Sequence, residues 1–267
     1  HNHIWTTEKG PDAGYAKRRD PPIPSPDPLT PDVKEDTMTD ENIVEAPQPV
    51  VDVANVGDWN KLLESATTDP EGFWEAEAQE LEWSKPWDKV LDRSDTPFFK
   101  WFTGASTNIV TNAVDRHLDT ARRNKLALIW VGEDTSKVRT FSYFSLAREV
   151  EQMANILLSM GVRKGDVVTI YLPRIPELFF AMLACAKIGA VHSVVFAGYS
   201  SEALNARIDG SESKVVITAD GSWINGKVFP MKQIVDDAVK FSPTVENVIV
   251  VKNTAVSYTH LTLPTKA

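Results

Sequence analysis

Beyond residue 160, short runs of β-branched residues alternate with stretches of helical periodicity. Four runs are predicted as strands: 166–172, 190–196, 214–220 and 245–251. Three helices are predicted between them: 176–188, 201–208 and 231–240. Because these strands are almost continuously apolar, the pattern is typical of a parallel sheet buried on both faces. It therefore predicts an α/β fold, with helices on both faces of a parallel sheet and right-handed connections.

Two further strands and one long helix are predicted immediately before this alternation. Residues 126–132 and 138–144 have the composition of strands at the edge of a sheet, joined by a turn at 133–137. A helix is predicted over 145–160, with Gly161 just past its end as a C-cap. Its apolar face is expected to comprise Leu146, Val150, Met153, Ala154, Leu157 and Leu158.

A tryptophan-rich segment, 57–102, holds five of the eight tryptophans. Its first part predicts two short helices broken at Asp69-Pro70, because proline suits the first turn of a helix. The tryptophans suggest either a ligand-stacking surface or a clamp that packs an N-terminal extension onto a larger body. We favour the clamp, since large aromatic side chains most often contribute buried contact area.

The first fifty residues contain nine of the 17 prolines and little apolar periodicity. Such a segment cannot bury enough surface to offset its ordering entropy, so residues 1–51 are predicted to be a disordered leader. A proline-rich docking arm is one interpretation. We favour the other, that residues 1–37 are not native, because residue 1 is His and Met38 opens a more ordinary sequence.

Composition narrows the functional classes. The 37 acidic residues exceed the 28 basic ones, and a net charge of −9 disfavours nucleic acid or an anionic membrane as partner. The longest apolar run, 178–186, is too short to span a bilayer. The single cysteine, Cys185, excludes an intramolecular disulfide and fits a reducing cytoplasm. The expected location is the cytoplasm.

Few catalytic signatures are present. The sequence contains no Walker A loop, dinucleotide fingerprint, zinc-protease motif or nucleophile elbow. His192 and Cys185 lie in apolar segments, and both are interpreted as core residues. Two loops remain as candidates: 195–200 ("VFAGYS") and 217–230 ("ITADGSWINGKVFP"), the second with a turn predicted at Asn225-Gly226-Lys227. Each leaves the carboxyl end of a predicted parallel strand, where α/β proteins bind ligands, although a glycine in such a loop is more often only a turn residue.

The segments "KWFTGASTNIVTNAVDRHL", "GVRKGDVVTIYLPRIPELFFAMLACAKIGAVHSVVFAGYSSEALNARI" and "KVVITADG" resemble the AMP-forming acetyl-CoA synthetases. The resemblance implies an N-terminal cap over 52–110 and a truncated AMP-binding domain over 111–255. It also implies ATP, magnesium, CoA and a short carboxylate as ligands, with acetyl-CoA, AMP and pyrophosphate as products. Residues 256–267 do not continue the family pattern and are predicted to be a foreign tail.

The resemblance assigns five residues to part of a CoA site: Gly198, Ile224, Asn225, Gly226 and Lys227. Ile224 stands where the family has arginine and Lys227 where it has a second arginine, so one cation is absent and the other lacks the arginine fork. In members of the family, the phosphate loop, the acyl pocket and the adenylation lysine lie downstream of the part that this sequence covers. No catalytic residue and no metal ligand are therefore predicted here, and the fragment alone is expected to be inactive.

Other assignments stay open at this point. A propionyl- or acetoacetyl-CoA synthetase would share the same N-terminal pattern. A different class is a non-catalytic short form that holds CoA or a partner through its tryptophan-rich cap.

Overall fold

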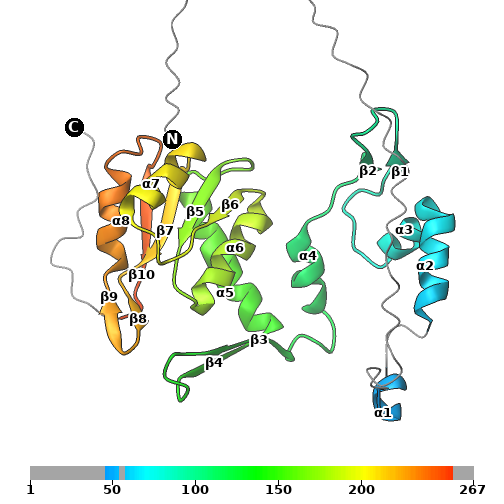
Figure 1. Cartoon of the computed structure of the whole chain (residues 1–267), viewed down its shortest axis with the longest axis horizontal. Coiled ribbons are helices and arrows are strands. Elements are labelled where there is room, and N and C mark those ends of the chain that lie inside the picture. Colours follow the sequence, from blue (N-terminus) through cyan, green and yellow to red (C-terminus); the bar gives the residue numbers. More distant parts are fainter. Residues whose placement is uncertain (1–45, 54–57, 255–267) are drawn as a thin grey trace, which may run out of the picture. The chain divides into compact units, whose positions relative to one another are not determined.

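The computed structural model describes residues 46–53 and 58–254, and the chain divides into two units, His1–Trp59 and Asn60–Ala267 (Figure 1). The proposed non-native segment 1–37 and the proposed tail 256–267 lie outside the described residues. Within the first unit, α1 (Gln48–Val51) is a single helical turn, and the Gln48 amide donates to Asp52. This turn lies at the end of the predicted leader, 1–51, of which residues 1–45 lie outside the described residues.

The second unit is built on a four-stranded parallel sheet in the order β10-β7-β5-β6. Its strands are β5 (Val167–Tyr171), β6 (Val191–Val194), β7 (Val215–Ala219) and β10 (Asn247–Val251). Every neighbouring pair is parallel. All four strands were predicted, and the α/β fold class is confirmed.

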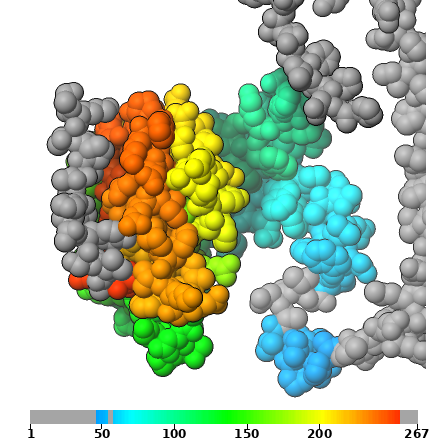
Figure 2. Space-filling model, turned by 60° about the vertical axis from the view of Figure 1, so that its left-hand side comes forward, coloured from blue at the N-terminus to red at the C-terminus, as the bar shows by residue number. Residues whose placement is uncertain are grey.

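The helices between these strands cover both faces of the sheet. They are α6 (Pro176–Ile188), α7 (Ser201–Gly210) and α8 (Met231–Val239). The β5–β6 connection runs in one direction along the sheet, whereas the next two run the opposite way. Right-handed crossovers therefore place α6 on one face and α7 and α8 on the other. In Figure 1, α8 lies to the left of the strands and α6 to their right, and Figure 2 shows α7 and α8 side by side.

The hydrophobic core surrounds the two central strands. All five residues of β7 are buried, as are Val168, Ile170 and Tyr171 of β5. The sequence predicted that β6 is equally buried and that His192 is a core residue. Both predictions are wrong, because β6 is an edge strand, where Val191 and Val194 are exposed and His192 is only half-buried.

The long helix α5 (Tyr143–Ser159) packs against α6. It begins two residues before its predicted start because Ser142 is its N-cap and accepts a hydrogen bond from the Ser145 amide. Gly161 follows its end at φ 81°, and the Val162 amide bonds back to the Leu157 carbonyl. This is a Schellman cap, as Gly161 predicted. The predicted apolar face is buried at four of its positions, whereas Met153 is half-buried and Leu158 is exposed.

The strands β3 (Leu126–Val131) and β4 (Val138–Ser142) form an antiparallel ribbon of their own. The predicted strands and their turn are present, and each is an edge strand of this two-stranded sheet. Over the described residues, neither strand pairs with β5, β6, β7 or β10.

The tryptophan-rich segment contains the two predicted helices, α2 (Trp59–Thr68) and α3 (Pro70–Gln79), with Asp69 as the N-cap of α3. It also contains a hairpin that was not predicted, β1 (Lys89–Asp92) with β2 (Lys100–Thr103). Ring contacts join Trp83 to Trp87 at 5.2 Å between centroids and both to Phe102. These tryptophans therefore stabilise the segment itself, as a packing cluster.

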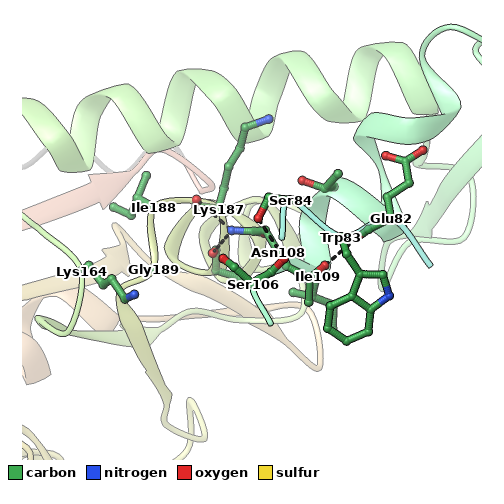
Figure 3. A pocket seen from close by; sticks show the side chains of 13 residues that line it. Glu82, Trp83, Ser84, Ser106, Asn108, Ile109, Lys164, Lys187, Ile188 and Gly189 are labelled. Atoms are coloured by element: carbon green, nitrogen blue, oxygen red, sulfur yellow. Dashed lines mark hydrogen bonds between the residues drawn. The ribbon is translucent and has the colours of Figure 1, made fainter. Parts of the chain in front are cut away.

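One asparagine ties this N-terminal part to the α/β body. Asn108 caps α4 (Ile109–Ala113) by accepting from the Val110 amide at 2.9 Å. Its Nδ2 donates to the carbonyls of Ala186 and Lys187 at 3.0 and 3.1 Å, at the C-terminal end of α6 (Figure 3). The same side chain therefore satisfies groups at the ends of two helices that lie 78 residues apart in sequence.

We predict that Asn108→Ala lowers the free energy of unfolding by about 1–3 kcal/mol, because one N-cap and two partly buried carbonyl contacts are lost. Asn108→Ser is the matched variant, since it keeps an N-cap acceptor but cannot reach α6. Urea unfolding should place it between wild type and Asn108→Ala. Equal stability of Asn108→Ser and wild type would contradict a stabilising contact with α6.

Candidate functional site

A cavity of about 760 Å³ opens at the carboxyl ends of the parallel strands. Segments that follow β5, β6, β7 and β10 all contribute to its wall, and the β3–β4 turn completes it. The lining residues are Trp130, Val131, Gly132, Glu133, Asp134, Lys137, Pro173, Arg174, Ile175, Phe196, Ala197, Gly198, Ser222, Trp223, Ile224, Gly226 and Asn253. Its volume lies within the range typical of small-molecule sites.

Three of the five predicted ligand residues line this cavity: Gly198, Ile224 and Gly226. Asn225 and Lys227 belong to the same hairpin but are not part of the lining. Lys227 pairs directly with Ile224 across the hairpin. Because directly paired residues project to the same face, the Lys227 side chain leaves the hairpin on the side of Ile224.

The predicted turn is the tip of a hairpin made by β8 (Ser222–Ile224) and β9 (Lys227–Phe229). Asn225 and Gly226 occupy its two central positions at φ 52° and 71°. Positive φ at both positions defines a type I′ turn, for which Asn-Gly is a favoured pair. The sequence thus predicted the turn correctly but not the short strands on either side.

The loop between β6 and α7 is held by a buried phenol. The Tyr171 hydroxyl donates to the carbonyls of Ala197 and Tyr199 at 2.9 and 3.0 Å, one on each side of Gly198. Burial raises the pKa of Tyr171, so the hydroxyl remains a proton donor at neutral pH. The next helix is capped by Ser200, whose hydroxyl accepts from the Ala203 amide. The loop that carries Gly198 is therefore held by hydrogen bonds on both sides of this glycine.

A buried carboxylate joins the exits of β7 and β10. Oδ1 of Asp220 accepts from the amides of Gly221, Asn253 and Thr254 at 2.8, 2.8 and 2.9 Å. Burial by itself raises the pKa of Asp220, but the hydrogen bonds from Thr254, Asn253 and Gly221 outweigh burial, and the net pKa is lowered. Asp220 thereby fixes the start of the segment that carries the hairpin.

The lining combines apolar surface with a balanced set of charges. Trp130, Trp223 and Phe196 provide aromatic surface, and two cations, Lys137 and Arg174, line the cavity together with two carboxylates, Glu133 and Asp134. Phe196 and Trp223 lie in the two candidate loops, whereas the other five residues were not predicted from the sequence. Arg174 could have been predicted, because it follows a predicted strand at the same edge. Trp130 and Lys137 gave no signal, since only the tertiary packing brings the β3–β4 ribbon here.

Cys185 is buried in α6, and burial raises its pKa to about 12, which confirms the interpretation of an inert core thiol. Across residues 46–53 and 58–254, no group of three or more His, Cys, Asp or Glu side chains is arranged to hold a metal ion. No helix in the described part of the chain is both long and apolar enough to span a bilayer.

A second cavity, of about 560 Å³, lies at the opposite end of the sheet (Figure 3). Lys164 and Gly189, which line it, precede β5 and β6, so this cavity is next to the amino ends of the strands. None of the five predicted ligand residues lines it. The cavity at the carboxyl ends is therefore the candidate site.

Two family models match the chain. The model described as AMP-binding enzyme matches residues 114–265, and the one described as acetyl-coenzyme A synthetase N-terminus matches residues 59–113. The two matched regions are adjacent, and their boundary lies between α4 and the short helix η2 (Asp115–His117).

Individual relatives agree with these models. An acetyl-coenzyme A synthetase from Pyrobaculum arsenaticum is 51% identical over 197 residues, covering 71% of this chain and 29% of the relative. One from Mycolicibacterium smegmatis is 45% identical over 210 residues, covering 79% and 22%. Among solved structures, acetoacetyl-CoA synthetase from Streptomyces lividans superposes with a TM-score of 0.70 at 28% identity, covering 77% of this chain and 32% of that one. The chain spans less than a third of the length of each of these three proteins.

We predict that Asp220→Asn lowers the free energy of unfolding at pH 7 by about 1–3 kcal/mol, because a charged acceptor of three amides is replaced by a neutral one. The folded-state pKa of Asp220 is lowered, so its contribution is complete above the unfolded pKa of about 3.9 and is lost as pH falls through the folded value. Urea unfolding at pH 7, 5 and 3 should show the difference from wild type narrowing in acid. Asp209→Asn, at an exposed position of α7, is the control. A pH-independent difference in stability between Asp220→Asn and wild type would contradict the assignment.

Proposed function

The chain belongs to the AMP-binding enzyme family, and we propose that it is the N-terminal part of an AMP-forming acetate–CoA ligase. The proposed reaction activates a short carboxylate with ATP, giving an acyl-adenylate and pyrophosphate. The thiol of CoA then displaces AMP and forms the thioester. Acetate is the proposed carboxylate, because acetyl-coenzyme A synthetases are 42–51% identical to this chain, whereas the acetoacetyl-CoA synthetase is 28% identical.

The observation that carries the proposal is the convergence of Gly198, Ile224 and Gly226 on one cavity at the carboxyl ends of the strands. These residues lie in two separate loops, yet they are the ones that the family pattern assigns to CoA. We propose that Gly198 allows close approach to the loop, and that the Ile224–Lys227 hairpin meets the phosphates of the CoA nucleotide. Lys227 supplies the charge there, Asn225 and Gly226 set the turn, and Ile224 contributes no charge.

The cavity fits a ligand of this kind in size and chemistry. It offers aromatic surface from Trp130, Trp223 and Phe196 together with the cations Lys137 and Arg174. An anionic ligand with an apolar body can use both features. The family also implies the use of ATP. The sites for ATP, magnesium and the carboxylate are proposed to belong to the rest of the enzyme, and we infer a cytoplasmic location.

Two other functions make different predictions. A propionyl- or acetoacetyl-CoA synthetase would share the same reaction with another carboxylate. A non-catalytic form would bind CoA or a protein partner without activating any carboxylate.

We predict that the protein encoded by the complete reading frame catalyses acetate-dependent exchange of pyrophosphate into ATP and forms acetyl-CoA when CoA is added. The 267-residue chain by itself should show no exchange above a no-protein control. Parallel assays with propionate and acetoacetate identify the carboxylate. Exchange that never exceeds background with any of the three would contradict the ligase assignment.

We predict that Lys227→Ala raises the apparent KM for CoA about tenfold or more in the full-length protein, because one charge-assisted contact is lost. The KM values for ATP and acetate should hardly change. Lys164→Ala is the matched control, since this lysine is exposed at the opposite end of the sheet. Ile224→Arg should lower the apparent KM for CoA, because it places a cation beside Lys227. An unchanged CoA constant in Lys227→Ala would contradict its role.

A further inference from the structure

A carboxylate already occupies the hairpin turn that borders the candidate site. The Gly226 amide, at the tip of the β8–β9 hairpin, donates to Oε1 of Glu133 at 2.9 Å. Glu133 belongs to the β3–β4 turn, 93 residues earlier in the chain. Both residues line the same cavity. A negatively charged hydrogen-bond acceptor therefore lies at the position where the proposed function places a phosphate.

Glu133 is presented by a hydrogen-bonded turn. The Gly132 amide bonds to the Lys137 carbonyl, and the Lys137 amide bonds to the Asp134 carbonyl, both at 2.9 Å. Oδ1 of Asp134 accepts from the amide and the hydroxyl of Ser136 at 3.1 and 2.7 Å. Hence the two adjacent carboxylates differ in their partners, because Asp134 closes its own turn and Glu133 reaches the hairpin.

The ribbon that carries this turn is attached to the sheet as well. The Trp130 indole donates to the Arg174 carbonyl at 2.7 Å, in the segment that follows β5. The ribbon thus contacts the cavity wall at Arg174 and at Gly226. This double attachment keeps Glu133 facing the hairpin turn.

We propose that Glu133 is a competing anion, which sets the affinity and the salt dependence of CoA binding. The inference rests on the proposed CoA site. In the free protein the carboxylate satisfies the Gly226 amide. A bound phosphate needs the same amide and is repelled by the charge of Glu133, so the side chain must turn away. Glu133 is exposed, which leaves it room to do so.

The test uses the full-length protein with Glu133→Gln, Glu133→Ala and, as the control, Asp209→Asn. Glutamine keeps an acceptor for Gly226 without the charge, whereas alanine removes both. Both Glu133 variants should lower the apparent KM for CoA about threefold at low ionic strength, because one repulsive unit charge is lost within a few ångströms of a phosphate. The ratio of the wild-type KM for CoA to that of each Glu133 variant should fall toward one as added salt screens the exposed charges. Asp209→Asn, at an exposed position of α7 outside the cavity lining, should change the constant less than twofold, and the KM values for ATP and acetate should stay constant.

Pantetheine, the thiol portion of CoA without phosphates, gives the second control. Its apparent KM should be the same in wild type and in both Glu133 variants. A raised CoA constant in Glu133→Ala would overturn the proposal, because Glu133 would then hold the turn in place for the ligand. An unchanged CoA constant in both variants would overturn it as well.

Failure of the proposed function can be recognised separately. Wild-type protein that forms no CoA thioester would refute the ligase assignment before any variant is compared. The contact itself is tested without CoA by amide hydrogen exchange of Gly226 in the 267-residue chain. Exchange should be faster in Glu133→Ala than in wild type and Glu133→Gln, and equal rates in all three would refute the contact.

Discussion

The parallel pairing of β5 with β6 and β7, and of β7 with β10, decides where the binding loops lie. Each connection between parallel strands must cross from one end of the sheet to the other, and a right-handed crossover does so through a helix on one face. The segments that leave the carboxyl ends consequently gather along one edge. Gly198 and Gly226 lie 28 positions apart in sequence, yet both line the cavity there. This constraint accounts for the parts of the cavity wall that follow β5, β6, β7 and β10.

Buried polar groups then hold these loops in place. Tyr171 bonds to two carbonyls of the β6–α7 loop, and Asp220 accepts from three amides where β7 and β10 end. A buried carbonyl or amide without a hydrogen-bond partner costs free energy. Each loop therefore adopts the conformation in which its backbone groups are paired. The same logic applies at the other end of the body, where Asn108 satisfies the last carbonyls of α6. Local polar contacts therefore determine the geometry that the sheet topology only permits.

The lining of the cavity carries as many carboxylates as cations, Glu133 and Asp134 beside Lys137 and Arg174. Under the proposed function, Ile224 also stands where the family pattern has a cation. Under the proposed function, CoA meets a turn whose amide is already bonded to a carboxylate. Binding there depends on aromatic contact area as well as on charge, since Trp130, Trp223 and Phe196 line the same cavity.

The sequence by itself determined those features that depend on neighbouring residues. Pro70 and Asp69 marked the start of α3, Gly161 marked the end of α5, and Asn225-Gly226 marked a tight turn, because the backbone angles that these residues favour are local properties. The apolar runs identified all four parallel strands, and their alternation with helices identified the fold class. Sequence periodicity could not tell an edge strand from a central one, so the burial of β6 and His192 was wrongly predicted.

Only the tertiary structure decided which segments meet. The β3–β4 ribbon forms a sheet of its own, and its turn reaches the hairpin 93 residues later through Glu133 and Gly226. The Asn108 amide reaches α6 in the same way, across 78 residues. Such contacts depend on how faces pack after the elements have formed, and no periodicity or spacing within either segment encodes the partner. For this reason the sequence located two loops of the candidate site, whereas its third wall and the carboxylate at the turn became visible only in the folded chain.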